Sequence, residues 1–173
     1  EAHAKIKKGN AMKQTKWYFF LSMLLICSLL LCGCTNNEPG EKALALYDAK
    51  TQSLDALSDV QQLSELILED DYGSYSVDMR QTTLYVTFQE VLDGGDKLTD
   101  QLYQVGAAFL CLIQDCTEVD FSYRALPEDG GVIEEKSLKV TMTRAQRLLK
   151  ADPKTYVESA KDVQNMLEQL KLD

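Results

Sequence analysis

The residue with the most specific chemical context is Cys34, which ends the run Leu31-Cys32-Gly33-Cys34. A short basic stretch with Lys13 and Lys16 comes first, and an uncharged apolar run from Trp17 to Leu31 follows it. At about fifteen residues, this run is shorter than the roughly twenty needed to cross a bilayer, but it fits the core of an export signal. The sequence therefore predicts an exported chain.

The end of this signal is similar to the bacterial lipobox, in which an aliphatic residue stands three positions before a cysteine and small residues fill the gap. That resemblance implies a diacylglycerol on the Cys34 thiol and cleavage before Cys34 by signal peptidase II. Two acyl chains are enough for stable anchoring. We therefore expect a lipoprotein with Cys34 as its mature N-terminus, held in the outer leaflet of the cytoplasmic membrane and facing the extracellular side. An uncleaved transmembrane anchor is the alternative.

The residues before Met12 need a different explanation, because a lipoprotein signal rarely carries an acidic, histidine-containing extension such as the one with Glu1 and His3. We expect translation to start at Met12, with Lys8-Gly9 as the reading of a purine-rich ribosome-binding site. The predicted organisation has three parts: an upstream extension plus signal peptide (1–33), a lipidated N-terminus and tether (34–43), and a single domain (44–173).

Cleavage before Cys34 removes most catalytic options. The only histidine, His3, and the only tryptophan, Trp17, lie upstream, and 13 basic and 26 acidic residues follow Cys34, for a net charge of −13. Such an acidic chain is repelled by nucleic acid, so no nucleic-acid partner is expected. Ser-His-Asp and Cys-His catalysis both need a histidine that the mature chain lacks. Apart from the covalent lipid, we expect no cofactor.

Two cysteines remain in the predicted domain, Cys111 and Cys116. They lie five positions apart around a predicted helix end, and in a regular helix that separation exceeds the reach of a disulfide. Cys111 lies in an apolar stretch, which favours a buried thiol. A disulfide that closes just past the helix end stays open as an alternative. Two cysteines without a histidine do not make a zinc site, so no metal is expected.

Carboxylates are the catalytic groups that remain. A glycoside hydrolase needs two carboxylates that converge across a cleft, whereas the acidic clusters here lie in predicted loops and are typical of a solvated surface. These clusters are Glu69-Asp70-Asp71, Asp93 with Asp96, Glu128-Asp129 and Glu134-Glu135. A carboxylate-dependent hydrolase of cell-envelope polymers is therefore the alternative to a non-enzymatic function.

The periodicity of apolar residues predicts the elements that would position these groups. Alternation predicts four strands, and helical spacing predicts four helices after a short turn and irregular chain in 41–57. The predicted strands are 75–80, 84–89, 119–124 and 138–142, and the predicted helices are 58–69, 97–115, 144–150 and 152–170. The expected helix caps are Ser58 (with Gln61), Asp96, Thr143 and Asp152, and Gly106-Ala107-Ala108 should let another element approach closely. The fold class is α+β: a four-stranded antiparallel sheet with helices packed on one face, in the order α-β-β-α-β-β-α-α.

The same alternation places a set of polar side chains on the other side of the sheet. This polar face would hold Asp78, Arg80, Tyr85, Thr87, Gln89, Asp120, Ser122, Arg124, Lys139 and Thr141. A flat face with an aromatic ring, two arginines and hydrogen-bonding groups could bind a peptide or a glycan partner. An ordinary solvated face is the alternative, because antiparallel sheets commonly face water on one side.

Several stretches carry a resemblance to a known domain family. They are Leu46-Tyr47-Asp48-Ala49-Lys50-Thr51, Leu84-Tyr85-Val86-Thr87-Phe88, the run 107–115 leading into Val119-Asp120-Phe121, and Thr143-Arg144. The chain resembles an extracytoplasmic domain of unknown function from Gram-positive bacteria, which occurs on small lipoproteins and on the tails of antirepressor-type membrane metalloproteases. It departs from the family after Lys50-Thr51, where Leu54-Asp55-Ala56-Leu57-Ser58 replaces a Gly-Asp-Asn-Ser-like segment.

The resemblance implies a sensing or partner-binding domain at the cell surface rather than an enzyme, since no activity is established for that family. A purely structural lipoprotein that acts through its helices is a third possibility.

Overall fold

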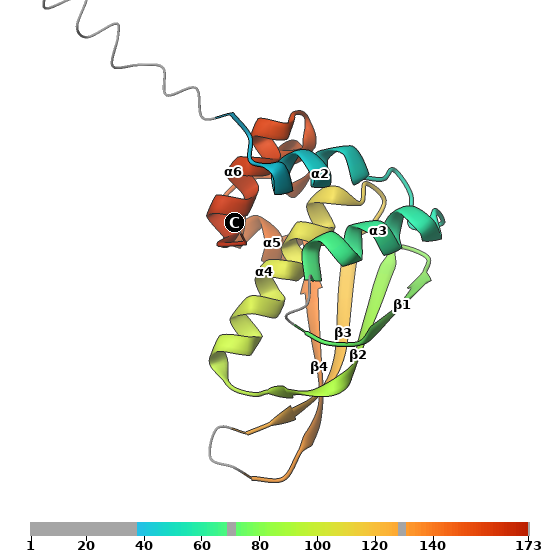
Figure 1. Ribbon diagram of the computed structural model, residues 1–173, viewed down its shortest axis with the longest axis vertical. Helices are drawn as coiled ribbons and strands as arrows, with labels where there is room; N and C mark the ends of the chain where they lie inside the picture. The colour runs from blue at the N-terminus through green and yellow to red at the C-terminus, as the bar shows by residue number, and fades with distance from the viewer. Residues whose placement is uncertain (1–37, 69–71, 128–130, 173) are drawn as a thin grey trace, which may run out of the picture. The chain divides into compact units, whose positions relative to one another are not determined.

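The computed structural model describes residues 38–68, 72–127 and 131–172 (Figure 1). From Pro39 onward the chain forms one compact unit. Cys34 and the export signal lie outside the described residues, as do the acidic clusters Glu69-Asp70-Asp71 and Glu128-Asp129. Among the helices in the described ranges, none combines the length and the apolar character that crossing a bilayer requires.

Helices and strands follow one another in the order α-α-β-β-α-β-β-α-η-α, where η is a 3-10 helix. They are α2 (Glu41–Ala49), α3 (Leu57–Leu68), β1 (Tyr75–Arg80), β2 (Thr83–Asp93), α4 (Asp96–Leu112), β3 (Glu118–Leu126), β4 (Glu134–Thr141), α5 (Met142–Leu149), η1 (Pro153–Val157) and α6 (Ala160–Leu170). The α+β class is thus confirmed. The predicted order is wrong at both ends, because a nine-residue helix replaces the irregular chain near residue 45 and the last predicted helix divides into η1 and α6.

The four strands form one sheet in the order β1-β2-β3-β4. β1 pairs antiparallel with β2 and β3 pairs antiparallel with β4, but β2 and β3 are parallel. The prediction of a fully antiparallel sheet is therefore wrong at its centre. The 17-residue helix α4 connects β2 to β3. A crossover of this length returns the chain to the end of the sheet where β2 begins, so β3 runs in the same direction as β2.

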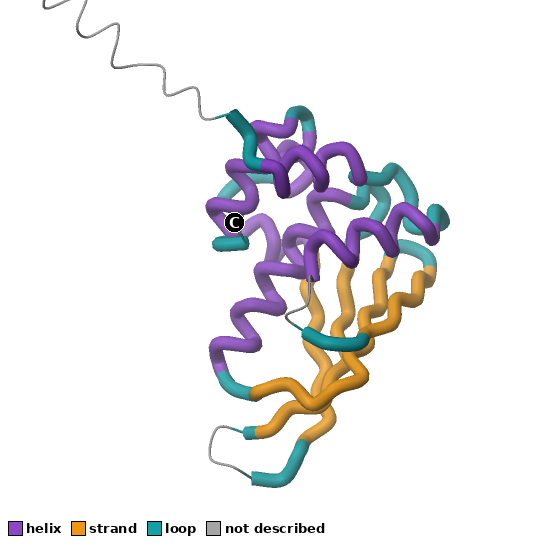
Figure 2. The backbone as a smooth tube through the Cα atoms, in the orientation of Figure 1, coloured by secondary structure: helices purple, strands orange, loops and turns teal. Residues whose placement is uncertain are grey.

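The apolar face of the sheet forms the floor of the core. Along β2 and β3, buried side chains such as Leu84, Val86 and Phe121 alternate with exposed or half-buried ones. Figure 2 shows the helices lying on one side of the sheet, where α4 packs on β3 and β4 and α3 lies beside β1. Because this side is covered, the opposite side of the sheet is the one left for solvent or a ligand.

The predicted cap at Asp152 is confirmed, since its Oδ1 accepts the Lys154 N–H at 3.0 Å, but the other three helix starts differ from the predicted ones. Ser58 lies inside α3, where its hydroxyl donates to Asp59 Oδ1 at 3.1 Å rather than capping the helix. Asp96 is the first residue of α4, and the cap position is Gly95, with a φ of 111°. Thr141 rather than Thr143 accepts the capping bond, from the Arg144 N–H.

Two of the stretches that carry the family resemblance meet at the end of α4. The Thr51 N–H donates to the Leu112 carbonyl at 3.1 Å, and the Gln114 N–H donates to the Thr51 carbonyl at 3.0 Å. Asp115 Oδ1 accepts the Leu54 N–H at 2.8 Å. These bonds join the segment after α2 to the loop between α4 and β3, so both stretches serve the packing of the helical layer.

Candidate ligand-binding face

The polar face is organised in rows that run across the strands. The strand register places Asp78 opposite Tyr85, Tyr85 opposite Asp120, and Asp120 opposite Lys139. The neighbouring row holds Arg80, Thr83, Glu118 and Thr141. All ten residues predicted for this face are exposed or half-buried, so the structure brings them to one side of the sheet as expected.

The central row consists of hydroxyl side chains on all four strands. Ser76 of β1 pairs with Thr87, Thr87 pairs with Ser122, and Ser122 pairs with Ser137 of β4. With neighbouring strands about 4.8 Å apart, this row spans roughly 14 Å. We call it the hydroxyl row. Its short side chains lie between rows of longer ones, so the sheet surface is lower there.

A groove of about 510 Å³ lies over the part of this row that belongs to β2, β3 and β4. Thr87, Ser122 and Ser137 form its floor, and Gln89, Arg124 and Glu135 line it on the next row along the strands. Phe88, Tyr123 and Lys136 complete the lining. The groove offers hydroxyl, amide, guanidinium and carboxylate groups at one place.

A bulge in β2 forms one edge of the groove. The pairing with β3 shifts between Thr87 and Val91, and within that interval the Gln89 carbonyl accepts a hydrogen bond of 2.6 Å from Arg124 Nη2. This bond to the backbone holds the guanidinium at the groove. It occupies one of the five N–H donors that an arginine carries.

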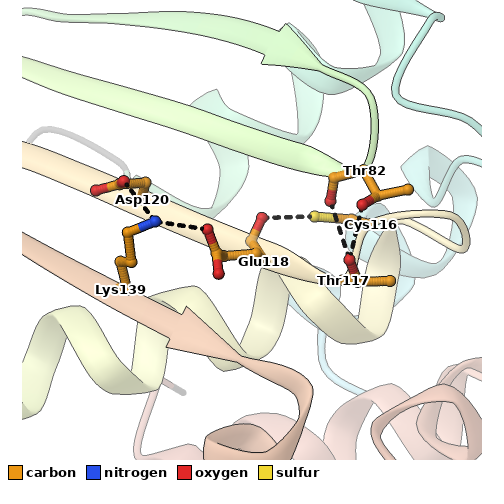
Figure 3. Close-up of polar contacts among 6 residues, drawn as sticks. All are labelled: Thr82, Cys116, Thr117, Glu118, Asp120 and Lys139. Carbon is orange, nitrogen blue, oxygen red and sulfur yellow. Dashed lines mark hydrogen bonds and ion pairs between the residues drawn. The ribbon is translucent and has the colours of Figure 1, made fainter.

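The other charged residues of the predicted face pair with one another. Lys139 Nζ lies 2.9 Å from Glu118 Oε1 and 3.5 Å from Asp120 Oδ2, as Figure 3 shows. The hydrogen bond to Glu118 and the charges of both carboxylates raise the pKa of the Lys139 ammonium group above its usual value.

A second pair lies on the β1 side. The Arg80 guanidinium binds Asp78 Oδ2 at 2.9 Å and lies 5.3 Å from the centre of the Tyr85 ring.

Within the described part of the chain, Asp120 Oδ1 is a buried oxygen without a hydrogen-bond partner.

The structure thus divides the predicted site residues into two groups. Thr87, Gln89, Ser122 and Arg124 line the groove, whereas Asp78, Arg80, Tyr85, Asp120 and Lys139 lie outside its lining. The sequence prediction missed Glu135 and Ser137, because it began the fourth strand at 138. The alternation Lys139, Ser137, Glu135 carries the pattern backward from that point and would have found both.

The acidic residues that the structure describes form no catalytic pair at this site. Glu135 supplies the only carboxylate among the described residues of the groove lining. Across the described ranges, no group of three or more His, Cys, Asp or Glu residues is placed to hold a metal ion. The groove therefore gives no support to the alternative of a carboxylate-dependent hydrolase.

Both cysteines of the described domain are buried, unpaired thiols. Burial raises the pKa of Cys111 to about 12 and that of Cys116 to about 11. The Cys116 Sγ donates to the Glu118 carbonyl at 3.3 Å (Figure 3). At neutral pH both groups are protonated, and a buried thiol in this form is a poor nucleophile.

Comparison with known proteins adds no relative. No family model matches the chain, and no curated protein or solved structure matches it either. The family resemblance noted in the sequence therefore stays a prediction.

Proposed function

We propose that this chain is a lipid-anchored, extracytoplasmic binding protein that holds a ligand of the cell envelope in the groove over its hydroxyl row. The observation that carries the proposal is the groove itself. The polar face predicted from alternation alone carries an open depression over Thr87, Ser122 and Arg124. An ordinary solvated face does not require such a depression.

The chemistry of the groove supports binding rather than turnover. Its hydroxyls donate and accept hydrogen bonds, Arg124 donates, and Glu135 accepts, so a polar ligand can be satisfied from several directions. A single carboxylate and two buried, protonated thiols supply neither a general acid–base pair nor a nucleophile. The location at the outer face of the cytoplasmic membrane is supported by the predicted export signal and by Cys34 in the sequence.

The experiment is photo-crosslinking in intact cells. A photoreactive amino acid placed at Ser137, on the groove floor, should give a discrete adduct with the bound ligand. Ser122→Leu, which fills the floor, should abolish the adduct, and Arg124→Ala should weaken it. Ser76→Leu is the matched control, because Ser76 belongs to the same hydroxyl row but lies outside the groove lining.

The proposal fails if irradiation gives no adduct, or if the adduct is equally strong with Ser122→Leu and Ser76→Leu. Thermal unfolding of each variant guards against a folding defect. Ser122 is exposed, and a substitution at an exposed position typically changes the stability by no more than about 0.5 kcal/mol.

A further inference from the structure

The exposed apolar side chains of this domain are concentrated at one end of the polar face. Among the described residues, the large apolar side chains that remain exposed are Leu44, Leu57, Val91, Leu126, Val132 and Ile133. The last four belong to the end of β2 or to the β3–β4 hairpin. Val132 is 84 % exposed and Ile133 is 49 % exposed. An apolar cluster that is open to water on an otherwise charged domain typically marks a contact surface.

This aliphatic cluster adjoins the groove. Val91 pairs with Arg124, which lines the groove, and Leu126 is two residues further along β3 on the same face. Ile133 comes two residues before Glu135, another lining residue. The polar groove and the aliphatic cluster are therefore successive parts of one surface.

The rim of the cluster is acidic. Asp93 pairs with Leu126 in the sheet register, and Glu135 pairs with Arg124 two residues past Ile133 on the same face. Glu134 and Lys136 belong to the opposite face of β4, where they pair with each other at 3.2 Å. Together with the net charge of −13 after Cys34, this rim attracts a basic partner and repels an acidic one.

We propose that the hairpin end of the polar face binds an extended polypeptide segment of a partner protein, one that places an aliphatic side chain against Leu126 and Ile133 and has basic residues beside it. This inference rests on the proposed ligand groove and identifies the class of ligand. The exposed side chains of the cluster are aliphatic, so they offer no aromatic ring for a sugar to stack on, and hydrophobic burial against a side chain is the chemistry that they favour.

The position of the aliphatic cluster favours a protein over the lipid bilayer as the partner that it contacts. Figure 1 shows the β3–β4 hairpin reaching past the start of α4, at the end of the domain away from α2. The predicted tether joins the domain at α2, so the hairpin end lies far from the attachment point. Its acidic rim is also repelled by anionic lipid headgroups.

The test is selection from a phage-displayed library of random dodecapeptides on the full-length, lipidated chain in detergent micelles. We expect enrichment of peptides in which Leu, Ile or Val adjoins Lys or Arg. A synthetic copy of an enriched peptide should bind at least tenfold more weakly to Leu126→Ser/Ile133→Ser than to the wild type. Leu44→Ser/Leu57→Ser is the matched control, because it removes two equally exposed aliphatic side chains from the helical layer, and its binding should be unchanged.

The outcomes separate this inference from the proposed function. A peptide whose binding is lost with Ser122→Leu but kept with Leu126→Ser/Ile133→Ser overturns the inference and leaves the groove in place. Binding of envelope glycans in place of peptides has the same consequence. Self-association of the chain that depends on Leu126 and Ile133, or vesicle binding that depends on them, also overturns the peptide assignment. A chain that binds neither peptide nor glycan overturns both proposals.

Discussion

Gly106 of α4 lies directly against Val140 of β4. A Cβ on Gly106 would come to 2.6 Å from Val140 Cγ2 and to 3.1 Å from Phe121 Cε2. Real Cβ contacts essentially never reach the shorter of these distances, and neither neighbour is the end of a long flexible chain. The helix and the sheet therefore pack as closely as they do because this position has no side chain.

This contact predicts that Gly106→Ala destabilises the fold. Overpacking in a well-packed core typically costs about 1–3 kcal/mol, which outweighs the gain of up to about 1 kcal/mol that alanine brings within a helix. Chemical denaturation should show a lower free energy of unfolding than for the wild type. Asp100→Ala, at an exposed position of the same helix, is the control and should have little effect. A rise in stability for Gly106→Ala would show that β4 can move away without cost.

The close approach at Gly106 was predictable, whereas the direction of the central strand pair was not predicted correctly. Alternation assigns a side chain to a face of the sheet, and this was sufficient for Thr87, Ser122 and Arg124. It contains no information about which strand is the neighbour or in which direction that neighbour runs. The connection supplied that information, since a long helix between two strands favours parallel pairing.

The groove depended on features that alternation does not show. Its edge is formed by the bulge after Thr87, where the register with β3 shifts. A bulge of this kind comes from tertiary packing and has no signature in a two-residue period. Its floor depends on three strands in register, so that Thr87, Ser122 and Ser137 form one row, and register is set in part by connections.

The C-terminal end of α4 predicts a second stability effect. Lys154 Nζ donates to the Leu110 and Ile113 carbonyls at 2.5 and 2.6 Å and to the Cys116 carbonyl at 3.0 Å. Burial lowers the pKa of this lysine, but the three acceptors hold its ammonium group in place. Lys154→Met would leave these carbonyls without that donor, and an unsatisfied buried polar group typically costs about 1–3 kcal/mol.

The measurement for Lys154 is a comparison of thermal unfolding midpoints. Lys154→Met should lower the midpoint well below that of Lys161→Met, in which the lysine removed is exposed on α6. Equal midpoints would mean that water replaces the ammonium group at the end of α4 without loss.

The buried thiols predict a dependence of stability on alkaline pH. Folding raises the pKa of Cys111 from an ordinary value of 9.0 to about 12, and that of Cys116 from 9.0 to about 11. Below pH 9 both thiols are protonated in the folded and in the unfolded chain. Above it the unfolded chain loses its protons first, so the free energy of unfolding falls with rising pH.

Chemical denaturation between pH 8 and about pH 10.5 checks this sign. Cys111→Ala/Cys116→Ala should be less stable at pH 8 but should lose less stability as the pH rises. The difference between the two slopes reports the thiols together with their electrostatic coupling to Lys154. Equal slopes would contradict the burial of these groups.

Thiol reactivity gives a second measurement. In a chain with Cys27, Cys32 and Cys34 replaced by serine, a disulfide reagent at pH 8 should react slowly with Cys111 and Cys116 until denaturant is added.

The predicted lipid on Cys34 gives the last test, because the location of the domain depends on it. Thioether formation needs the Cys34 sulfur, so Cys34→Ala should incorporate no labelled palmitate in cells and should stay uncut, with a larger mass than the wild type. Cys32→Ala is the matched control: it removes a neighbouring thiol but keeps Leu31 and the small residues before Cys34, so processing should continue.

The intact mass of the Cys34→Ala precursor also reports where translation starts, since a precursor that contains His3 would contradict a start at Met12. Wild-type labelling or cleavage in Cys34→Ala would remove the anchor from the proposed function, while the photo-crosslink at Ser137 would still test the groove.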